Sequence, residues 1–192
     1  MKILVTGAAG FIGSHTVEAL LARGDEVVAL DNFNDYYDPA RKWANVEKAR
    51  SQPGYRLIQG DVRDASLLAE VFDGEGIEKV CHIAAMAGVR YSIEHPELYE
   101  SVNVGGTLAL LEQARQHDVT SFVFASSSSV YGANNPVPFR EDAVVNQPIS
   151  PYAATKVAKE VLAYTYHHLY GLNCTGLRFF TVYGPRGRPD MA

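Results

Sequence analysis

The residues that are best suited to catalysis are Tyr152 and Lys156, which lie four positions apart in the segment YAATK. This spacing places both side chains on the same face of a helix. An ammonium close to a phenol favours the phenolate and would lower the tyrosine pKa from its ordinary value of about 10. Tyr152 is therefore a candidate acid and base for a substrate hydroxyl, which suits hydride transfer to a nicotinamide. The same spacing occurs by chance in many helices, so the pair needs support from the rest of the chain.

A run of hydroxyl side chains, Ser126 to Ser129, follows the apolar segment Phe122 to Ala125. Ligands of open α/β sheets bind beyond the carboxyl ends of the strands, so these serines are candidates to hydrogen-bond a reacting oxygen. A serine-rich strand exit that only caps neighbouring backbone is the alternative.

Three glycines, Gly7, Gly10 and Gly13, follow the first apolar run and precede an amphipathic segment. A tight turn without side chains lets a pyrophosphate approach the N–H groups at a helix start, so we predict dinucleotide binding. Asp31 lies 18 positions after Gly13 at the end of the next apolar run. A carboxylate there accepts hydrogen bonds from ribose hydroxyls and repels a 2′-phosphate, which favours NAD over NADP. A helix cap or a solvated turn is the alternative for Asp31, and Asp61 is a candidate either to flank the adenine or to cap a helix.

The elements that must position these residues are six short apolar runs separated by longer helical patterns. This alternation predicts a doubly wound α/β fold of the Rossmann type, a parallel sheet covered by helices on both faces. The predicted strands are 3–6, 26–30, 55–59, 79–83, 121–125 and 174–179. Proline after Asp38, His95 and Ser150 marks helix starts, and Asp64 is a predicted cap. The breakers between positions 131 and 150 predict a long surface loop.

The composition is that of one ordinary globular domain, with 192 residues, 47% hydrophobic side chains and a net charge of -5. The absence of a basic stripe argues against nucleic acid as a partner. No apolar segment is long enough for a membrane span and no leader precedes the first strand, which argues against membrane insertion and secretion. Cys81 and Cys174 fall inside predicted buried strands, as expected for reduced thiols in the cytoplasm, so neither a disulfide nor a metal site is predicted. His15, His82, His167 and His168 are interpreted as packing residues.

The chain resembles the extended short-chain dehydrogenase/reductase superfamily, within it the NAD-dependent nucleotide-sugar epimerases and dehydratases, and specifically UDP-glucuronate 4-epimerases. The motifs that carry this resemblance are TGAAGFIG at 6–13, HIAAMAGVRYSIEHP at 82–96, ASSSSVYG at 125–132, SPYAATK at 150–156 and LRFFTVYGPRGRPDMA at 177–192.

The resemblance implies a role for each residue that matches a family motif. The implied catalytic residues are Ser127, with Ser128 as a close alternative, Tyr152 as the base and Lys156 as its partner. The implied cofactor contacts are Gly7, Gly10, Phe11, Ile12, Gly13, Asp31, Asn32, Asn34, Asp61, Val62, Ala84, Ala85, Asn103, Tyr152 and Lys156. The implied substrate contacts are Met86, Arg90, Ser127, Ser128, Thr181 and Arg188. Arg188 matches a carboxylate-binding arginine, whereas Arg90 is equally well explained as a solvated surface residue.

The reaction that the resemblance implies is epimerisation at C4 of a UDP-sugar, UDP-glucuronate to UDP-galacturonate, through a transient 4-keto sugar, in a homodimer. Sugar-nucleotide 4,6-dehydratases and UDP-glucuronate decarboxylases are the nearest alternatives. Dehydratases are expected to have Asp and Glu where this chain has Ser128 and Ser129, and decarboxylases to have Glu in place of Ser129. A sugar-alcohol dehydrogenase would release NADH. A non-catalytic NAD-binding module is the alternative from another class.

The resemblance also implies a domain boundary near the end of the sequence. We expect residues 1–180 to form the NAD-binding domain and 181–192 to begin a substrate-binding region. Because the sequence ends inside the last motif, it looks truncated, and most of the C-terminal substrate domain is expected to be absent.

Overall fold

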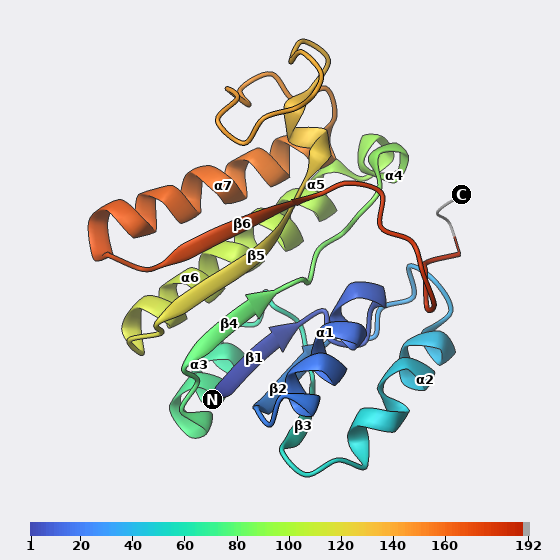
Figure 1. The fold of residues 1–192 in the computed structure, drawn as a ribbon, viewed down its shortest axis with the longest axis vertical. Helices are drawn as coiled ribbons and strands as arrows, with labels where there is room; N and C mark the ends of the chain where they lie inside the picture. The colour runs from blue at the N-terminus through green and yellow to red at the C-terminus, as the bar shows by residue number, and fades with distance from the viewer. Residues whose placement is uncertain (190–192) are drawn as a thin grey trace.

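A computed structural model describes residues 1–189 of the chain. Six parallel strands form one sheet in the order β3-β2-β1-β4-β5-β6 (Figure 1). The strands are β1 (Lys2–Thr6), β2 (Glu26–Asp31), β3 (Tyr55–Gln59), β4 (Lys79–His82), β5 (Ser121–Ser127) and β6 (Cys174–Phe179). This arrangement confirms the predicted doubly wound parallel sheet.

The helices alternate with the strands along the chain, and both faces of the sheet carry helices (Figure 1). They are α1 (Phe11–Ala22), α2 (Pro39–Arg50), α3 (Ala65–Glu75), α4 (Val89–Glu94), α5 (Pro96–Tyr99), the π-helix η1 (Glu100–Gly105), α6 (Gly106–Gln116), the 3-10 helix η2 (Ser128–Tyr131) and α7 (Pro151–Tyr170). None of the helices in residues 1–189 combines the length and the apolar composition that crossing a membrane requires.

Alternation of side chains along β1 builds a core on each face of the sheet. Ile3 and Val5 pack into a cluster that contains Val17 of α1. Leu4 packs into the opposite cluster, which contains Leu68 of α3. Burying both faces of the central strands excludes water from most of the sheet and holds its carboxyl edge in a fixed position.

The two edge strands depart from the prediction of strands buried on both faces. In β6, the residues Thr175, Gly176 and Leu177 are exposed, and Cys174 is only half-buried. In β3, Arg56 and Gln59 are exposed. An edge strand has a neighbour on one side only, so its apolar sequence does not guarantee burial.

Strand β5 is two residues longer than predicted because Ser126 and Ser127 pair with Arg178 and Phe179 of β6. The apolar run ends at Ala125, but backbone pairing with β6 continues the strand. Two of the four serines predicted to follow this strand therefore belong to it, and only Ser128 and Ser129 enter the 3-10 helix.

The helix starts were predicted correctly. Proline occupies the first turn of α2, α5 and α7. Asp38, Asp64 and Ser150 each accept a backbone N–H of the helix that they precede. Helix α1 differs, since it begins after Gly10 and no side chain caps it. The segment between Tyr131 and Ser150 contains no helix or strand beyond the 3-10 helix, as predicted.

Candidate active site

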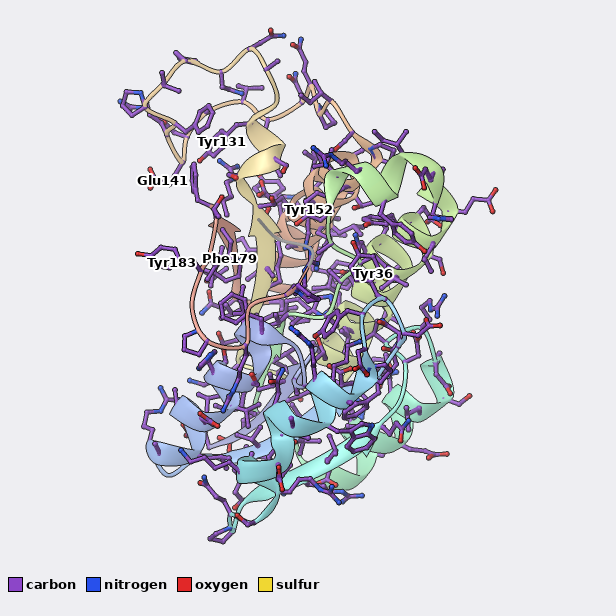
Figure 2. All side chains as sticks on the ribbon, turned by 90° about the vertical axis from the view of Figure 1, so that its right-hand side faces the viewer. Tyr36, Tyr131, Glu141, Tyr152, Phe179 and Tyr183 are labelled. Atoms are coloured by element: carbon purple, nitrogen blue, oxygen red, sulfur yellow. The ribbon has the colours of Figure 1, made fainter. Side chains whose placement is uncertain are left out.

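Tyr152 and Lys156 lie on adjacent turns at the start of α7 and face the carboxyl end of β5. The Lys156 ammonium is buried and donates to the carbonyl oxygen of Ala125 at 2.9 Å. Its Nζ atom lies 5.5 Å from the centre of the Tyr152 ring. The four-residue spacing therefore brings the two groups together as predicted. In the view of Figure 2, Tyr152 lies between Tyr131 and Tyr36.

Burial dominates the electrostatics of this pair. It lowers the pKa of Lys156 to about 8, because a buried ammonium loses its hydration. Burial also raises the pKa of Tyr152, while a hydrogen bond with Ser127 and the positive charge of Arg188 act in the opposite direction. The expected net lowering of the Tyr152 pKa is therefore wrong for the chain alone. The prediction left out the cost of desolvating the phenolate.

Ser127 fits both roles that the sequence left open, the capping of backbone and a hydrogen bond at the reacting centre. Its hydroxyl accepts the backbone N–H of Ser129 at 3.2 Å, which is a capping role. It also hydrogen-bonds Tyr152. Ser127 is buried at the last position of β5, whereas Ser128 is half-buried in the first position of the 3-10 helix. Of these two candidates, Ser127 is the one in contact with Tyr152.

The glycine loop connects β1 to α1 with very little space around it. Gly7 has φ +68, and a Cβ there would lie 2.7 Å from the backbone nitrogen of Ala84. A Cβ at Gly13 would lie 2.0 Å from the carbonyl oxygen of Gly7. These two glycines are required by the turn itself. Gly10 leaves the uncapped start of α1 free of side-chain atoms, next to the half-buried Phe11 and Ile12.

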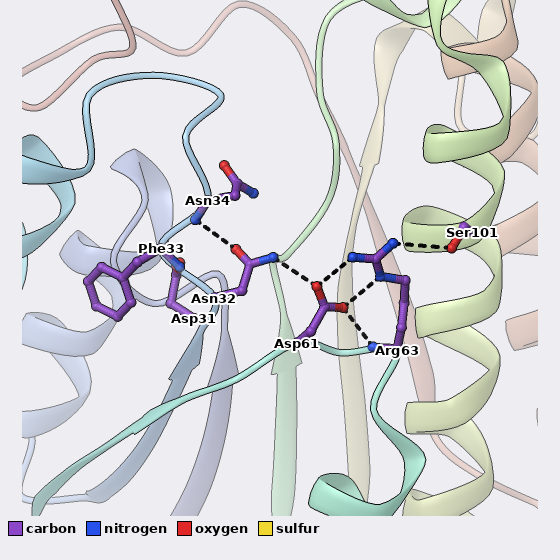
Figure 3. Close-up of polar contacts among 7 residues, drawn as sticks. All are labelled: Asp31, Asn32, Phe33, Asn34, Asp61, Arg63 and Ser101. Carbon is purple, nitrogen blue, oxygen red and sulfur yellow. Dashed lines mark hydrogen bonds and ion pairs between the residues drawn. The ribbon is translucent and has the colours of Figure 1, made fainter.

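Asp31 joins the end of β2 to the glycine loop. Its carboxylate accepts the backbone N–H of Ala9 at 3.0 Å and that of Phe33 at 2.9 Å. The next two positions repeat this local pattern, since Asn32 accepts the N–H of Asn34 at 3.1 Å (Figure 3). Each carboxylate oxygen keeps a lone pair for a further donor. Asp31 thus has a structural role and retains the capacity to accept ribose hydroxyls.

Asp61 does not cap a helix, because the cap of α3 is Asp64. Its carboxylate is held by the guanidinium of Arg63 at 2.8 Å and by the amide of Asn32 at 2.9 Å (Figure 3). Arg63 is the main reason that the pKa of Asp61 falls to about 2. The carboxylate is therefore ionised and fixed between the ends of β2 and β3, next to the buried Val62.

The side chain of Asn103 holds the segment Ala84–Met86, which follows β4. The backbone N–H of Ala84 donates to the Thr6 hydroxyl at 3.2 Å. Met86 donates to the Asn103 side chain at 2.8 Å and accepts from it at 3.0 Å. Asn103 is fully buried, so this structure gives it a positioning role, and a direct contact with a cofactor stays a prediction. Ala84 and Ala85 remain half-exposed at the sheet edge.

Four predicted substrate contacts lie at different places in the structure. The guanidinium of Arg188 lies 5.4 Å from the centre of the Tyr36 ring and is close enough to influence Tyr152 electrostatically. Met86 is buried in the core cluster against which Tyr36 and Tyr152 pack. Arg90 on α4 and Thr181 after β6 are exposed, and their contact with a substrate stays a prediction. Residues 190–192 of the last family motif lie outside the described residues.

The segment Gly184–Arg188, which we call the strap, crosses from β6 to the first helix (Figure 1). His15 of α1 contacts the carbonyl oxygen of Pro185 at 2.9 Å. Arg186 pairs with Glu18 at 2.7 Å, and this contact lowers the pKa of Glu18. The strap thereby carries Arg188 to Tyr36, on the loop after β2. Sequence reasoning missed Tyr36, His15 and Glu18, whose neighbours in space are distant in sequence.

Two further features lie outside the predicted catalytic set. Among residues 1–189, no three His, Cys, Asp or Glu side chains are grouped so that they could hold a metal ion. A hollow of about 650 Å³ lies between α7 and β6, and its lining includes none of Ser127, Tyr152 and Lys156. The candidate site is therefore the shared edge of β1, β4 and β5 and not this hollow.

Known proteins resemble this chain over nearly its whole length. A family model described as GDP-mannose 4,6 dehydratase matches residues 4–192. UDP-glucuronate 4-epimerase 1 of Arabidopsis thaliana is 53% identical over 193 residues, covering 100% of this chain and 45% of the relative. The chain thus spans about half the length of the curated relatives that it matches.

Solved structures match across the whole described fold. A UDP-glucuronic acid 4-epimerase from Bacillus cereus, in complex with UDP-glucuronic acid and NAD, superposes with a TM-score of 0.92 at 39% identity, covering 100% of this chain and 60% of that one. A dTDP-glucose 4,6-dehydratase from Streptomyces venezuelae with NAD bound gives a TM-score of 0.90 at 37% identity, covering 99% and 59%.

Proposed function

Because the chain belongs to the NAD-dependent sugar epimerase/dehydratase family, we propose that it serves epimerisation at C4 of a UDP-sugar, interconverting UDP-glucuronate and UDP-galacturonate. The observation that carries the proposal is the convergence of Ser127, Tyr152 and Lys156 at the carboxyl end of β5, beside the glycine loop. A proton-transfer group next to a dinucleotide loop is what oxidation and reduction of a sugar hydroxyl require.

The residues present fit NAD as the cofactor. Gly10 and the uncapped N–H groups of α1 are suited to a pyrophosphate, since the helix dipole also favours negative charge there. Asp31 is placed for the adenosine ribose, with Asn32, Asn34, Asp61 and Val62 around it. When bound, NAD would supply the acceptor and donor of the C4 hydride.

The chain's own residues would handle the proton and the orientation of the sugar. In its phenolate form, Tyr152 would take the proton of the sugar 4-hydroxyl and return it once the 4-keto sugar has presented its other face. Ser127 donates to the same oxygen, and Lys156 provides positive charge within 5.5 Å of the phenol ring. Arg188 is the proposed partner of the substrate carboxylate, with Met86 as a further substrate contact. The exposed Arg90 and Thr181 and the half-buried Ser128 remain proposed substrate contacts.

Dehydration and decarboxylation remain the competing reactions, since the matching family model carries a dehydratase description. Ser128 and Ser129 follow Ser127 and provide no carboxyl group for acid catalysis. Glu160, which contacts β5 through Ser126, is engaged by Arg178 at 2.8 Å and 3.0 Å. A carboxylate held in this way is poorly placed to protonate a leaving hydroxyl, so epimerisation is the better-supported reaction.

The proposed assembly is a homodimer in the cytoplasm. Leu108 of α6 and Val161 and Tyr164 of α7 are exposed apolar side chains on two adjacent helices, a pattern that favours burial against a second copy. Cys81 and Cys174 are both free thiols, which is consistent with a reducing compartment.

The deciding experiment incubates the protein with NAD and UDP-glucuronate and separates the nucleotide sugars by chromatography. UDP-galacturonate without net NADH supports the proposal. UDP-xylose with carbon dioxide selects decarboxylation, a 4-keto-6-deoxy product selects dehydration, and net NADH selects a dehydrogenase. NAD binding without turnover of any UDP-sugar would identify a non-catalytic binding module.

A further inference from the structure

A chain of hydrogen bonds between fully buried side chains links β1, β4 and α6 close to the candidate site. The Thr6 hydroxyl at the end of β1 lies 2.7 Å from Nδ1 of His82, the last residue of β4. The other ring nitrogen of His82, Nε2, lies 2.9 Å from the Thr107 hydroxyl on α6. All three residues have no exposed surface. Both nitrogens of this histidine are therefore used inside the protein.

The directions of these hydrogen bonds follow from the contacts at each end. The Thr107 hydroxyl donates its single hydrogen to the carbonyl oxygen of Asn103 at 2.5 Å, so it can only accept from His82. His82 must then carry its hydrogen on Nε2, and Nδ1 accepts from Thr6. The Thr6 oxygen is free to accept the backbone N–H of Ala84, which lies at 3.2 Å. The network thus selects one tautomer of a neutral imidazole.

The surroundings of His82 also favour the neutral ring. Burial is the main cause that holds its pKa well below the ordinary value, and the positive charges of Lys159 and Lys156 on α7 act in the same direction. An imidazolium would place a second N–H against the Thr6 hydroxyl, which would then have to release its donation to Nδ1.

The network continues from Asn103 to the start of α7. The Asn103 amide forms two hydrogen bonds with the backbone of Met86, at 2.8 Å and 3.0 Å. It also donates to the Thr155 hydroxyl at 3.0 Å, and Thr155 donates to the carbonyl oxygen of Tyr152 at 2.8 Å. One connected set of buried side chains therefore links the segment Ala84–Met86 to the backbone of Tyr152.

We propose that His82 is a positioning residue, which through its Nε2–H tautomer fixes the segment Ala84–Met86 relative to Tyr152. The link between this geometry and cofactor binding rests on the proposed function, whereas the tautomer and the fixing of the segment do not. A histidine used only for packing would fill the same volume without a required proton position, so the two roles differ in what they predict.

The first test is the nitrogen spectrum of the His82 ring in the wild-type protein at pH 7, with the resonances assigned by their loss in His82→Phe. The expected result is a protonated, pyrrole-type Nε2 and an unprotonated, pyridine-type Nδ1. A protonated Nδ1 or an imidazolium would overturn the proposal. Because the tautomer is read from the wild-type protein, this test does not depend on how variants of Thr107 fold.

The second test measures amide hydrogen exchange in Thr107→Val, which removes the acceptor of the His82 proton. The amide of Met86 should exchange about tenfold faster relative to the amides of Val80 and Cys81 in β4, as expected for the loss of one buried hydrogen bond. Thr107→Ser keeps the hydroxyl and should restore the wild-type rate. Uniform acceleration along β4 and the Met86 segment would contradict the positioning role.

The matched control is Thr165→Val on α7, where an exposed threonine makes the same hydrogen bond to the carbonyl four residues back, at 3.0 Å. It should leave exchange at Met86 unchanged.

Calorimetric titration with NAD then separates the positioning role of His82 from the proposed function. If the wild type does not bind NAD, the proposed function fails. If it binds, Thr107→Val should bind several-fold more weakly than Thr107→Ser, and equal affinities would remove His82 from any role in the cofactor site.

Discussion

The Nζ atom of Lys156 lies 2.9 Å from the carbonyl oxygen of Ala125, two residues before Ser127. This contact holds the first turns of α7 against β5, the strand that ends at Ser127. Because Tyr152 belongs to the same turns, the distance between its hydroxyl and Ser127 is set by the packing of one helix against one strand. The proposed chemistry thus depends on secondary structure and not on a mobile loop.

Tyr152→Phe should reduce interconversion of UDP-glucuronate and UDP-galacturonate by a factor of about 10² to 10⁴, the usual contribution of a positioned acid and base. NAD affinity should change little, since the ring is retained. Steady-state rates and calorimetry measure the two effects. Tyr164→Phe, the same substitution at an exposed site on α7, is the control. Near wild-type turnover in Tyr152→Phe would refute the assignment.

Asp31→Ser should narrow the preference for NAD over NADP by about fivefold, since removing one charge relieves a repulsion of about 1 kcal/mol. It should also lower the free energy of unfolding by about 1 to 3 kcal/mol, because the buried N–H groups of Ala9 and Phe33 lose an acceptor. Asp31→Asn removes the charge but keeps an oxygen, so it should shift the cofactor preference with a smaller loss of stability. Unchanged preference in both variants would leave Asp31 with a structural role only.

Lys159→Met should raise the free energy of unfolding at pH 7 by about 1 to 4 kcal/mol, because it removes a buried amino group that has no hydrogen-bond partner among residues 1–189 and that loses its hydration and its favoured charged form on folding. Burial, with the nearby charge of Lys156, holds the Lys159 pKa well below its ordinary 10.5. Between these two pKa values the unfolded chain binds one more proton than the folded chain, so the wild type gains stability as the pH rises. The advantage of the variant should therefore shrink by about 1.4 kcal/mol per pH unit towards 10.5.

Urea denaturation at pH 7, 8 and 9 measures this trend for Lys159→Met. Lys48→Met, at an exposed position of α2, should show no comparable gain and no such pH dependence. A loss of stability in Lys159→Met at pH 7 would show that the Lys159 side chain makes a stabilising contact.

Arg178→Ala should destabilise the protein by about 2 kcal/mol, because it leaves the carboxylate of Glu160 partly buried without its partner. Arg178 also donates to the carbonyl oxygen of Glu141 at 3.2 Å, so the segment 132–150 should become more sensitive to proteolysis. Arg140→Ala removes an ion pair of similar chemistry whose side chains are 74% and 71% exposed, and it should change stability very little. Equal rates of proteolysis in Arg178→Ala and Arg140→Ala would show that Arg178 does not keep the segment 132–150 ordered.

The sequence was sufficient for the order of elements because each signal is local. Proline after Asp38 and Ser150, and Asp64 as a cap, act within one helical turn. The meeting of Tyr152 with Lys156 follows from helix geometry alone. The resemblance supplied Ser127, which the structure brings into contact with Tyr152.

The remaining features depend on residues that are distant in the sequence. The two extra residues of β5 come from pairing with β6, and the raised Tyr152 pKa comes from burial by elements that no local pattern describes. The role of His82 was missed because its partners, Thr6 and Thr107, lie 76 and 25 positions away. Packing was the reasonable interpretation until both ring nitrogens could be seen to have partners.

The strap has a consequence for the order in which the molecule assembles. Its contacts with α1 join residues that are 170 and 168 positions apart, so they close almost the entire described chain into one loop. Such contacts form late in folding, because the entropy of closing a long loop must be overcome before they contribute any stability. During synthesis the glycine loop and α1 leave the ribosome before β6, and they acquire these neighbours only after β6 and the strap have emerged. The dinucleotide loop therefore acquires its neighbours in the strap only after about 170 further residues have been synthesised.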